Sequence, residues 1–258
     1  MSYSWSDLDN LLLYRGVLQD PLVQLLRSNA ATAEKNAALI KAAEELSLEG
    51  DIVFEYLLHL LAEDENPFSI MAEKSGGQIG ASLQQAVVRD ITQLQHFFQS
   101  NQTTPADDFL QNYQPTRSVP RAFINPLRLA LKSPAAVNDP SAALATFTDH
   151  YVRHGYGDMA RYAVFRWDLE LGLVPVRHPD RIQMDDLIGY ERQKAVLTQN
   201  TEAFVAGRPA NNVLLVGSRG TGKSSSVKAL LNQYADMGLR LVEITKHDLR
   251  HLSSIMQA

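Results

Sequence analysis

The sequence predicts two parts of different fold class: a mainly α-helical N-terminal domain and, after it, an α/β module. Between residues 8 and 154, apolar residues recur at helical spacing, and no run has the character of a convincing strand. The pattern changes at Asn212–Val216, a short apolar run that favours a buried parallel strand. A glycine-rich stretch and a second helical pattern, Ser225–Tyr234, follow it. Strand, glycine loop and helix in this order indicate an α/β unit.

Length and composition bound the class of protein. With 258 residues, the chain can hold one large or two ordinary domains. Its net charge of −5 gives no general attraction to nucleic acid or to an anionic membrane, so we expect neither as a partner. The absence of cysteine excludes disulfides, thiolate metal sites and a cysteine nucleophile. No secretion signal or membrane-spanning run is recognisable, and we therefore expect a cytoplasmic protein.

The N-terminal domain is expected to consist of successive helices. One or two short helices should break around Asp20–Pro21, because proline suits a helix start. An alanine-rich helix should follow within residues 29–48, and Asp51 has the position of an N-cap for a strongly apolar helix. The further expected helices are Ala81–Ser100, Ala122–Leu131 and Ser141–His154.

Two stretches are interpreted as connections. Residues 101–120 are rich in polar residues and proline, which indicates a mobile linker or an irregular surface loop. In residues 155–179 basic and aromatic residues interleave, a pattern that we interpret as a core helix edge and domain junction rather than a single-stranded nucleic-acid site. The predicted organisation is a helical domain at 1–175, a linker at 176–184 and the α/β module at 185–258.

The glycine-rich stretch fits the phosphate-binding loop pattern G-x-x-x-x-G-K-[ST] at every fixed position. Its residues are Gly217, Ser218, Arg219, Gly220, Thr221, Gly222, Lys223 and Ser224. Glycines let backbone N–H groups turn toward an anion, and the N-terminus of the next helix adds its positive dipole end. Lys223 would reach the β- and γ-phosphates, the Ser224 hydroxyl would ligate Mg²⁺, and Ser225 would complete the nucleotide-binding set. We therefore expect ATP and Mg²⁺ as ligands. A chance match in a Gly/Ser turn would not explain why strand, loop and helix agree.

A resemblance extends this interpretation. Asp186–Lys194, followed by Asn211–Gly217 and the loop, resembles the start of an AAA+-type ATPase module. With its continuation through residue 250, the sequence resembles the bacterial family catalogued as domain of unknown function 815. The resemblance implies a helical region before an AAA+-like P-loop ATPase module. It also implies that Ile188, Gly189 and Tyr190 line the adenine pocket. A plain helix N-terminal turn with a buried Ile188 stays open as the alternative.

The second acidic motif of such ATPases is missing from the sequence. Leu239–Ile244 is the only strand pattern after the loop, and its Glu243 is better interpreted as an outward residue than as the acid that anchors Mg²⁺. The resemblance implies that the acidic strand, a sensor residue, an arginine finger and a lid lie beyond residue 258. We therefore expect an incomplete module with no catalytic residue and little hydrolysis. Its two strands would keep unpaired edges or pair out of the native order.

Two functions from different classes follow from these patterns. The first is an ATP-binding protein of the AAA+-like class, whose helical domain binds a protein partner or regulates the module and whose full-length form is a homo-oligomer. The alternative is a nucleotide-independent helical interaction module with a vestigial ATPase stub, and transfer by a kinase is a weaker third. The pairs His150/His154 and His247/His251 have metal-ligand spacing without a third ligand, so we expect solvated or helix-end histidines.

Overall fold

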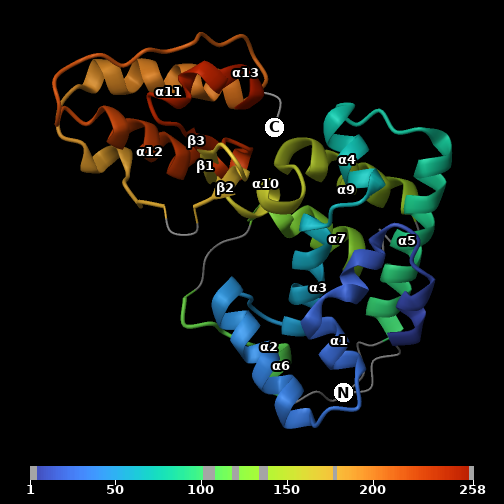
Figure 1. The fold of residues 1–258 in the computed structure, drawn as a ribbon. Helices are drawn as coiled ribbons and strands as arrows, with labels where there is room; N and C mark the ends of the chain where they lie inside the picture. Colours follow the sequence, from blue (N-terminus) through green and yellow to red (C-terminus); the bar gives the residue numbers. More distant parts are fainter. Residues whose placement is uncertain (1–4, 101–107, 118–121, 134–138, 177–178, 256–258) are drawn as a thin grey trace. The chain divides into compact units, whose positions relative to one another are not determined.

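A computed structural model describes residues 5–100, 108–117, 122–133, 139–176 and 179–255. The chain divides into two units, residues 1–157 and residues 158–258, here called the helical unit and the C-terminal unit (Figure 1). In the described residues of the helical unit there are helices and no β-strand, whereas the C-terminal unit holds a three-stranded sheet. The predicted combination of an α-rich domain with a small α/β part is therefore confirmed.

The helices of the helical unit begin where the sequence supplies capping groups. The Asp20 carboxylate accepts hydrogen bonds from the N–H groups of Leu22 and Val23, and Asp51 accepts one from Phe54, as predicted. The elements are η1 (Trp5–Asn10), η2 (Tyr14–Gln19), α1 (Pro21–Arg27), α2 (Thr32–Leu46), α3 (Ile52–Glu63), α4 (Pro67–Lys74), α5 (Ala81–Ser100), α6 (Asp108–Gln111), η3 (Ala122–Ile124), α7 (Asn125–Lys132) and α9 (Pro140–His154), and α10 (Gly157–Arg161) spans the division.

Helix α4 is not among the expected helices. In the structure the Asn66 side chain accepts from the N–H groups of Phe68 and Ser69, and the Ser69 hydroxyl accepts from the N–H of Asn66. Proline at the first helical position completes a start signal, because its missing N–H would have no helical partner there.

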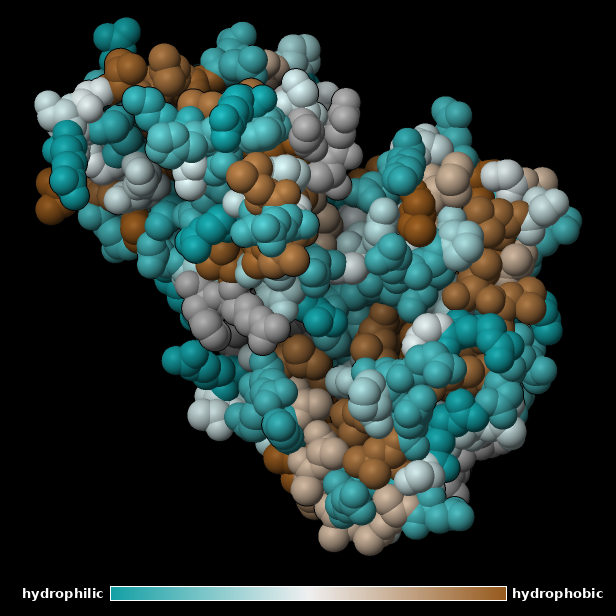
Figure 2. Space-filling view, viewed as in Figure 1, coloured by the Kyte–Doolittle hydropathy of each residue, from teal (hydrophilic) through white to brown (hydrophobic). Residues whose placement is uncertain are grey.

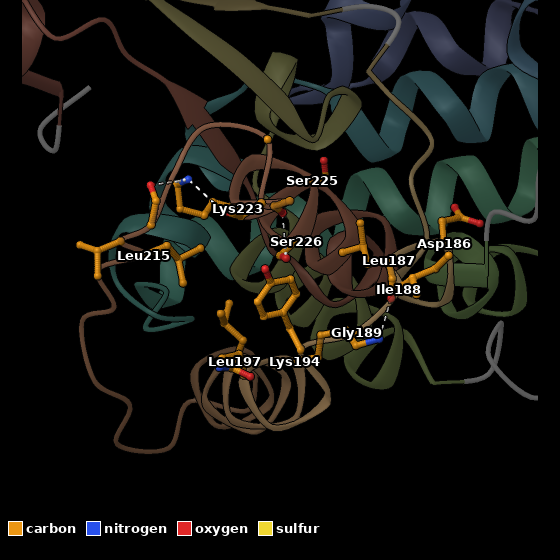
Figure 3. A pocket seen from close by; sticks show the side chains of 17 residues that line it. Asp186, Leu187, Ile188, Gly189, Lys194, Leu197, Leu215, Lys223, Ser225 and Ser226 are labelled. Carbon is orange, nitrogen blue, oxygen red and sulfur yellow. Dashed lines mark hydrogen bonds between the residues drawn. The ribbon is translucent and has the colours of Figure 1, made fainter.

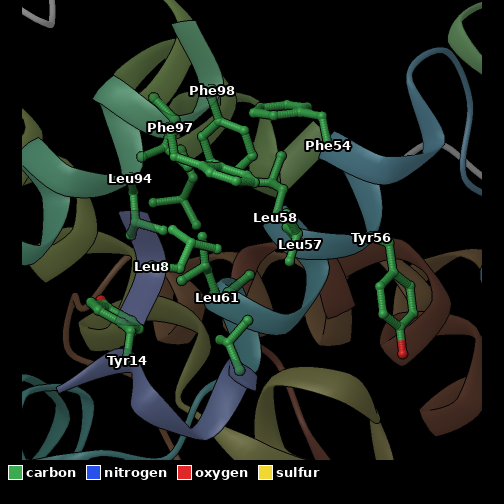
Figure 4. Close-up of a cluster of buried hydrophobic side chains, with 14 of the residues drawn as sticks. Leu8, Tyr14, Phe54, Tyr56, Leu57, Leu58, Leu61, Leu94, Phe97 and Phe98 are labelled. Carbon is green, nitrogen blue, oxygen red and sulfur yellow. The ribbon is translucent and has the colours of Figure 1, made fainter. Parts of the chain in front are cut away.

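The core of the helical unit forms around α3, which is apolar on nearly all sides. Ten of its twelve residues are buried. Figure 4 shows its leucines and Phe54 against residues from η1, η2 and α5. Phe54 and Phe98 meet edge to face with ring centroids 4.7 Å apart. Tyr56 points away from this cluster, and its hydroxyl donates to Asp20, which ties α3 to the cap of α1.

The C-terminal unit contains a small mixed sheet in the order β2-β1-β3, formed by β1 (Val164–Asp168), β2 (Gly172–Pro175) and β3 (Leu241–Glu243). β1 pairs antiparallel with β2, with Trp167 opposite Leu173, and parallel with β3, with Phe165 opposite Val242. The helices are η4 (Met184–Asp186), α11 (Glu191–Val205), α12 (Lys223–Tyr234), η5 (Ala235–Met237), η6 (Asp248–His251) and α13 (Leu252–Ile255). In the described part of the chain, no helix has the length and apolarity needed to cross a membrane.

The strand content differs from the prediction in two places. Residues 164–175, interpreted as a core helix edge and domain junction, form a hairpin, because the Asp168 carboxylate accepts from the N–H groups of Glu170 and Leu171 in its turn. Since this hairpin pairs with β3, the C-terminal unit starts at residue 158, upstream of the expected linker. Part of that linker, residues 177–178, lies outside the described residues. The same holds for two parts of the expected loop at 101–120, namely residues 101–107 and 118–120.

The second difference concerns Asn212–Val216, for which the prediction of a strand is wrong. This segment has no strand assignment, and Leu214 and Val216 are more than 80% exposed. The physical reason is that a strand exists only with a hydrogen-bonding partner. β3, the other strand expected in the module, pairs with β1 instead.

The carboxylate of Asp90 determines how the N-terminal turns pack on α5. It is fully buried and accepts hydrogen bonds from the N–H groups of Leu12, Leu13 and Tyr14, at 2.7–3.2 Å.

Replacing Asp90 by alanine leaves these donors without an acceptor. We therefore expect Asp90→Ala to lower the free energy of unfolding by about 3–5 kcal/mol in urea titrations followed by circular dichroism. Thr92→Ala, on the exposed side of the same helix, is the control and should cost nothing. A loss below about 1 kcal/mol at position 90 would contradict this role.

Asp64 makes the stability of the chain depend on pH. Burial raises the pKa of this carboxyl to about 6, although the hydrogen bond that it accepts from Asn66 acts to lower the pKa. The folded state therefore binds the proton more tightly than the unfolded state, where the pKa is about 3.9. The stabilising effect of this proton is present below about pH 4 and is lost as the pH rises through 6.

A comparison with Asp64→Asn isolates this contribution. Between pH 4 and pH 7, the free energy of unfolding of the wild type should fall by about 2 kcal/mol relative to that of the variant. Asp149→Asn, which removes an exposed carboxylate, should give a profile parallel to that of the wild type. Parallel profiles for Asp64→Asn as well would show that the carboxyl keeps its ordinary pKa.

Candidate functional site

Three glycines shape the turn before α12, here called the glycine loop (residues 217–222). The backbone φ angles are +151° at Gly217, +82° at Gly220 and +77° at Gly222. L-residues with a side chain rarely adopt these conformations, so the loop depends on glycine at all three positions. Gly222 is also the N-cap of α12 and brings the chain directly into the helix.

The loop leaves backbone donors available. Among the described residues, no protein acceptor is paired with the N–H groups of Gly220, Thr221 and Gly222. The first N–H groups of α12 have no partner within the helix either, as at any helix start. Unpaired N–H groups and the positive end of the helix dipole both favour an anion at this place.

The ammonium of Lys223 lies within the loop. Its Nζ donates to the carbonyl oxygens of Gly217 at 3.0 Å and Ser218 at 2.6 Å, and to the Thr221 hydroxyl at 3.2 Å. The Thr221 hydroxyl in turn donates to the carbonyl of Ser218. All three ammonium hydrogens therefore have neutral acceptors, and no carboxylate among the described residues is paired with Lys223.

A cavity of about 660 Å³ opens beside the loop, with residues 186–190, here called the wall, on its other side (Figure 3). Of the residues predicted for the site, the structure brings together Gly217, Gly220, Thr221, Gly222, Lys223, Ser225, Ile188, Gly189 and Tyr190 as lining residues. The other predicted residues, Ser218, Arg219 and Ser224, are exposed and do not line the cavity. Two segments that lie far apart in sequence thus share one cavity.

The wall is exposed and locally strained. Ile188 is 96% exposed, so the alternative interpretation of a buried Ile188 is wrong. Gly189 has φ +81°, and Tyr190, the N-cap of α11, has φ +60°. A left-handed conformation at a non-glycine residue costs about 1–3 kcal/mol. Such strain persists only where the surrounding structure demands it.

Helix α11 completes the cavity with residues that the sequence analysis missed: Gln193, Lys194 and Leu197. The signal was present, because these positions follow Tyr190 at the three-to-four-residue spacing of one helix face. The Lys194 ammonium donates to the Leu187 carbonyl at 2.8 Å and so holds the wall against α11. Leu187 also lies against Gly222, since its Cδ2 is 4.0 Å from the position of a Cβ there.

The charge of Lys223 favours an anion in the cavity. The lining includes two cations, Lys194 and Lys223, and one carboxylate, Asp186, which accepts from the N–H of Gln183. Because Lys194 is paired with the Glu191 carboxylate at 2.9 Å, Lys223 is the lining cation that has no carboxylate partner among the described residues. Glu243, which the sequence analysis did not take for a Mg²⁺ ligand, lines no part of this cavity. Its carboxylate lies 3.5 Å from Arg166 and 3.9 Å from Lys228.

The histidine pairs do not form a metal centre. In the part of the chain that the structure describes, no group of three metal-ligating side chains comes together. His150 is buried rather than solvated, which corrects the prediction. Its ring stacks on Phe123, and its Nε2 lies 3.0 Å from the carbonyl oxygen of Ala62. It is therefore a core residue of the helical unit.

Comparison with known proteins gives a family match in the C-terminal part of the chain. No curated protein and no solved structure matches the chain. Residues 160–258 match the family described as Protein of unknown function (DUF815), which confirms, for this part of the chain, the family that the sequence resembles.

Proposed function

We propose that the C-terminal unit binds a nucleoside triphosphate, ATP with Mg²⁺, in the cavity between the glycine loop and the wall. The observation that carries the proposal is the conformation of a complete phosphate-loop sequence. All three glycines have positive φ, and Lys223 starts a helix at the edge of a cavity. At about 660 Å³, the cavity has the size of ordinary small-molecule sites.

The phosphates would lie on the loop side. The N–H groups of Gly220, Thr221 and Gly222 are donors without protein acceptors among the described residues, and they suit phosphate oxygens. Lys223 now donates to two carbonyls and one hydroxyl. Phosphate oxygens carry negative charge that these carbonyl and hydroxyl acceptors lack, so a bound phosphate adds a direct attraction between opposite charges to the hydrogen bonds of the ammonium.

The Ser224 hydroxyl would ligate Mg²⁺, which neutralises phosphate charge when it is bound. Ser224 is exposed in the first turn of α12 and does not line the cavity, so a cation bound by its hydroxyl would lie at the edge of the cavity. The base and ribose would lie toward the wall, where Ile188 and Tyr190 offer apolar surface. Binding, rather than hydrolysis, is the activity that these residues support.

Titration of a fluorescent ATP analogue with Mg²⁺ tests the proposal. The wild type should bind saturably, and Lys223→Ala should bind about 10- to 100-fold more weakly, because a charged hydrogen bond is worth about 1.5–3 kcal/mol. Lys246→Ala removes the same charge from an exposed residue that does not line the cavity and serves as the matched control. Equal affinity of Lys223→Ala and wild type would refute a phosphate site at the loop.

A further inference from the structure

A side-chain amide on α12 holds the segment that leads to the wall. The Nδ2 of Asn232 donates to the carbonyl oxygens of Asp180, at 3.0 Å, and Ile182, at 2.8 Å. An amide nitrogen has two hydrogens, so both donors of Asn232 are used on one short segment. These two bonds, here called the clamp, fix residues 180–182 on the helix.

A charge pair on the same helix face reinforces the clamp. Lys228 lies one turn before Asn232, and its Nζ is 2.6 Å from the Asp180 carboxylate. This hydrogen bond raises the pKa of Lys228, so the ammonium keeps its charge over the neutral range. Residues 180–182 are thus held from two successive turns of α12.

A short, internally bonded path connects the clamp with the wall. The N–H of Gln183 donates to the Asp186 carboxylate at 2.7 Å, and the N–H of Leu187 donates to the Met184 carbonyl at 3.3 Å. The residues that follow have little core packing, since Ile188 is 96% and Tyr190 58% exposed. The position of the wall therefore depends on its hydrogen-bonded supports more than on buried apolar area.

We propose that Asn232 is a positioning residue of the nucleotide site and determines its affinity for the nucleoside half of the ligand. The inference rests on the proposed function of nucleotide binding. The physical reason is that one rigid helix, α12, carries Lys223 of the phosphate side in its first turn and the clamp, which holds the segment leading to the wall, further along. Helix α12 therefore sets the spacing between loop and wall, although Asn232 touches neither.

The test compares Mg·ATP with Mg·tripolyphosphate, which presents the phosphates without a nucleoside. Asn232→Leu keeps the size of the side chain and removes both donors. In calorimetric titrations of the full chain, it should lower the affinity for Mg·ATP about tenfold, which corresponds to the loss of one to two neutral hydrogen bonds. The affinity for Mg·tripolyphosphate should stay unchanged. Gln233→Leu is the matched control. It removes the neighbouring amide, which donates to the Tyr234 hydroxyl, and should alter neither affinity.

Each result distinguishes positioning from plain destabilisation. If Asn232→Leu loses affinity for both ligands equally, or for neither ligand, the positioning role is overturned while the binding function stands. A wild type that binds neither ligand overturns both proposals. If circular dichroism shows Asn232→Leu to be unfolded, Asn232→Asp, which keeps the shape without the donors, takes its place.

Hydrogen exchange without ligand gives a second criterion. The backbone amides of residues 183–190 should exchange faster in the variant than in the wild type, and unchanged protection there also contradicts the proposal.

Discussion

The conformation of Gly222 is the constraint on which the candidate site depends. At φ +77°, the backbone leaves the glycine loop and enters α12 in a single residue, so Lys223 stands in the first turn of a regular helix. Leu187 of the wall packs against the same glycine. Loop, helix and wall therefore meet at one residue that has no side chain, and any larger residue would have to adopt a strained backbone there.

The sequence predicts best those features that are encoded locally. The cap at Asp51 agrees with the structure, and the helix predicted at Ser141–His154 is α9, which begins one residue earlier, at Pro140. The signals for both helix starts lie within a few residues of the helices themselves. The phosphate-loop pattern likewise specifies glycine at positions 217 and 222, two of the three loop positions where φ is positive. The grouping of Ile188–Tyr190 with the loop came from a family resemblance, because single-sequence patterns contain no information on which distant segments meet.

Features that depend on distant partners were mispredicted. β1 contains the aromatic and basic residues Phe165, Arg166 and Trp167, and its pairing with β3, more than seventy residues later, leaves no sign in the local pattern. Asn212–Val216 has the composition of a strand and no partner among the described strands, and composition alone gives no β-structure. His150 looked like a solvated helix-end residue, yet α9 turns it into the core.

Without a strand before the loop, side-chain amides hold the site together. Asn200 of α11 pairs with the backbone of Asn211 through two bonds of 2.9 Å, as a neighbouring strand would, and so fixes the start of the segment that leads into the loop. Asn232 does the same for the segment that leads into the wall. The two helices α11 and α12 are joined by the bond from the Tyr234 hydroxyl to Glu202. The geometry of the cavity therefore depends on a frame of two helices, and the three-stranded sheet contributes none of its lining residues.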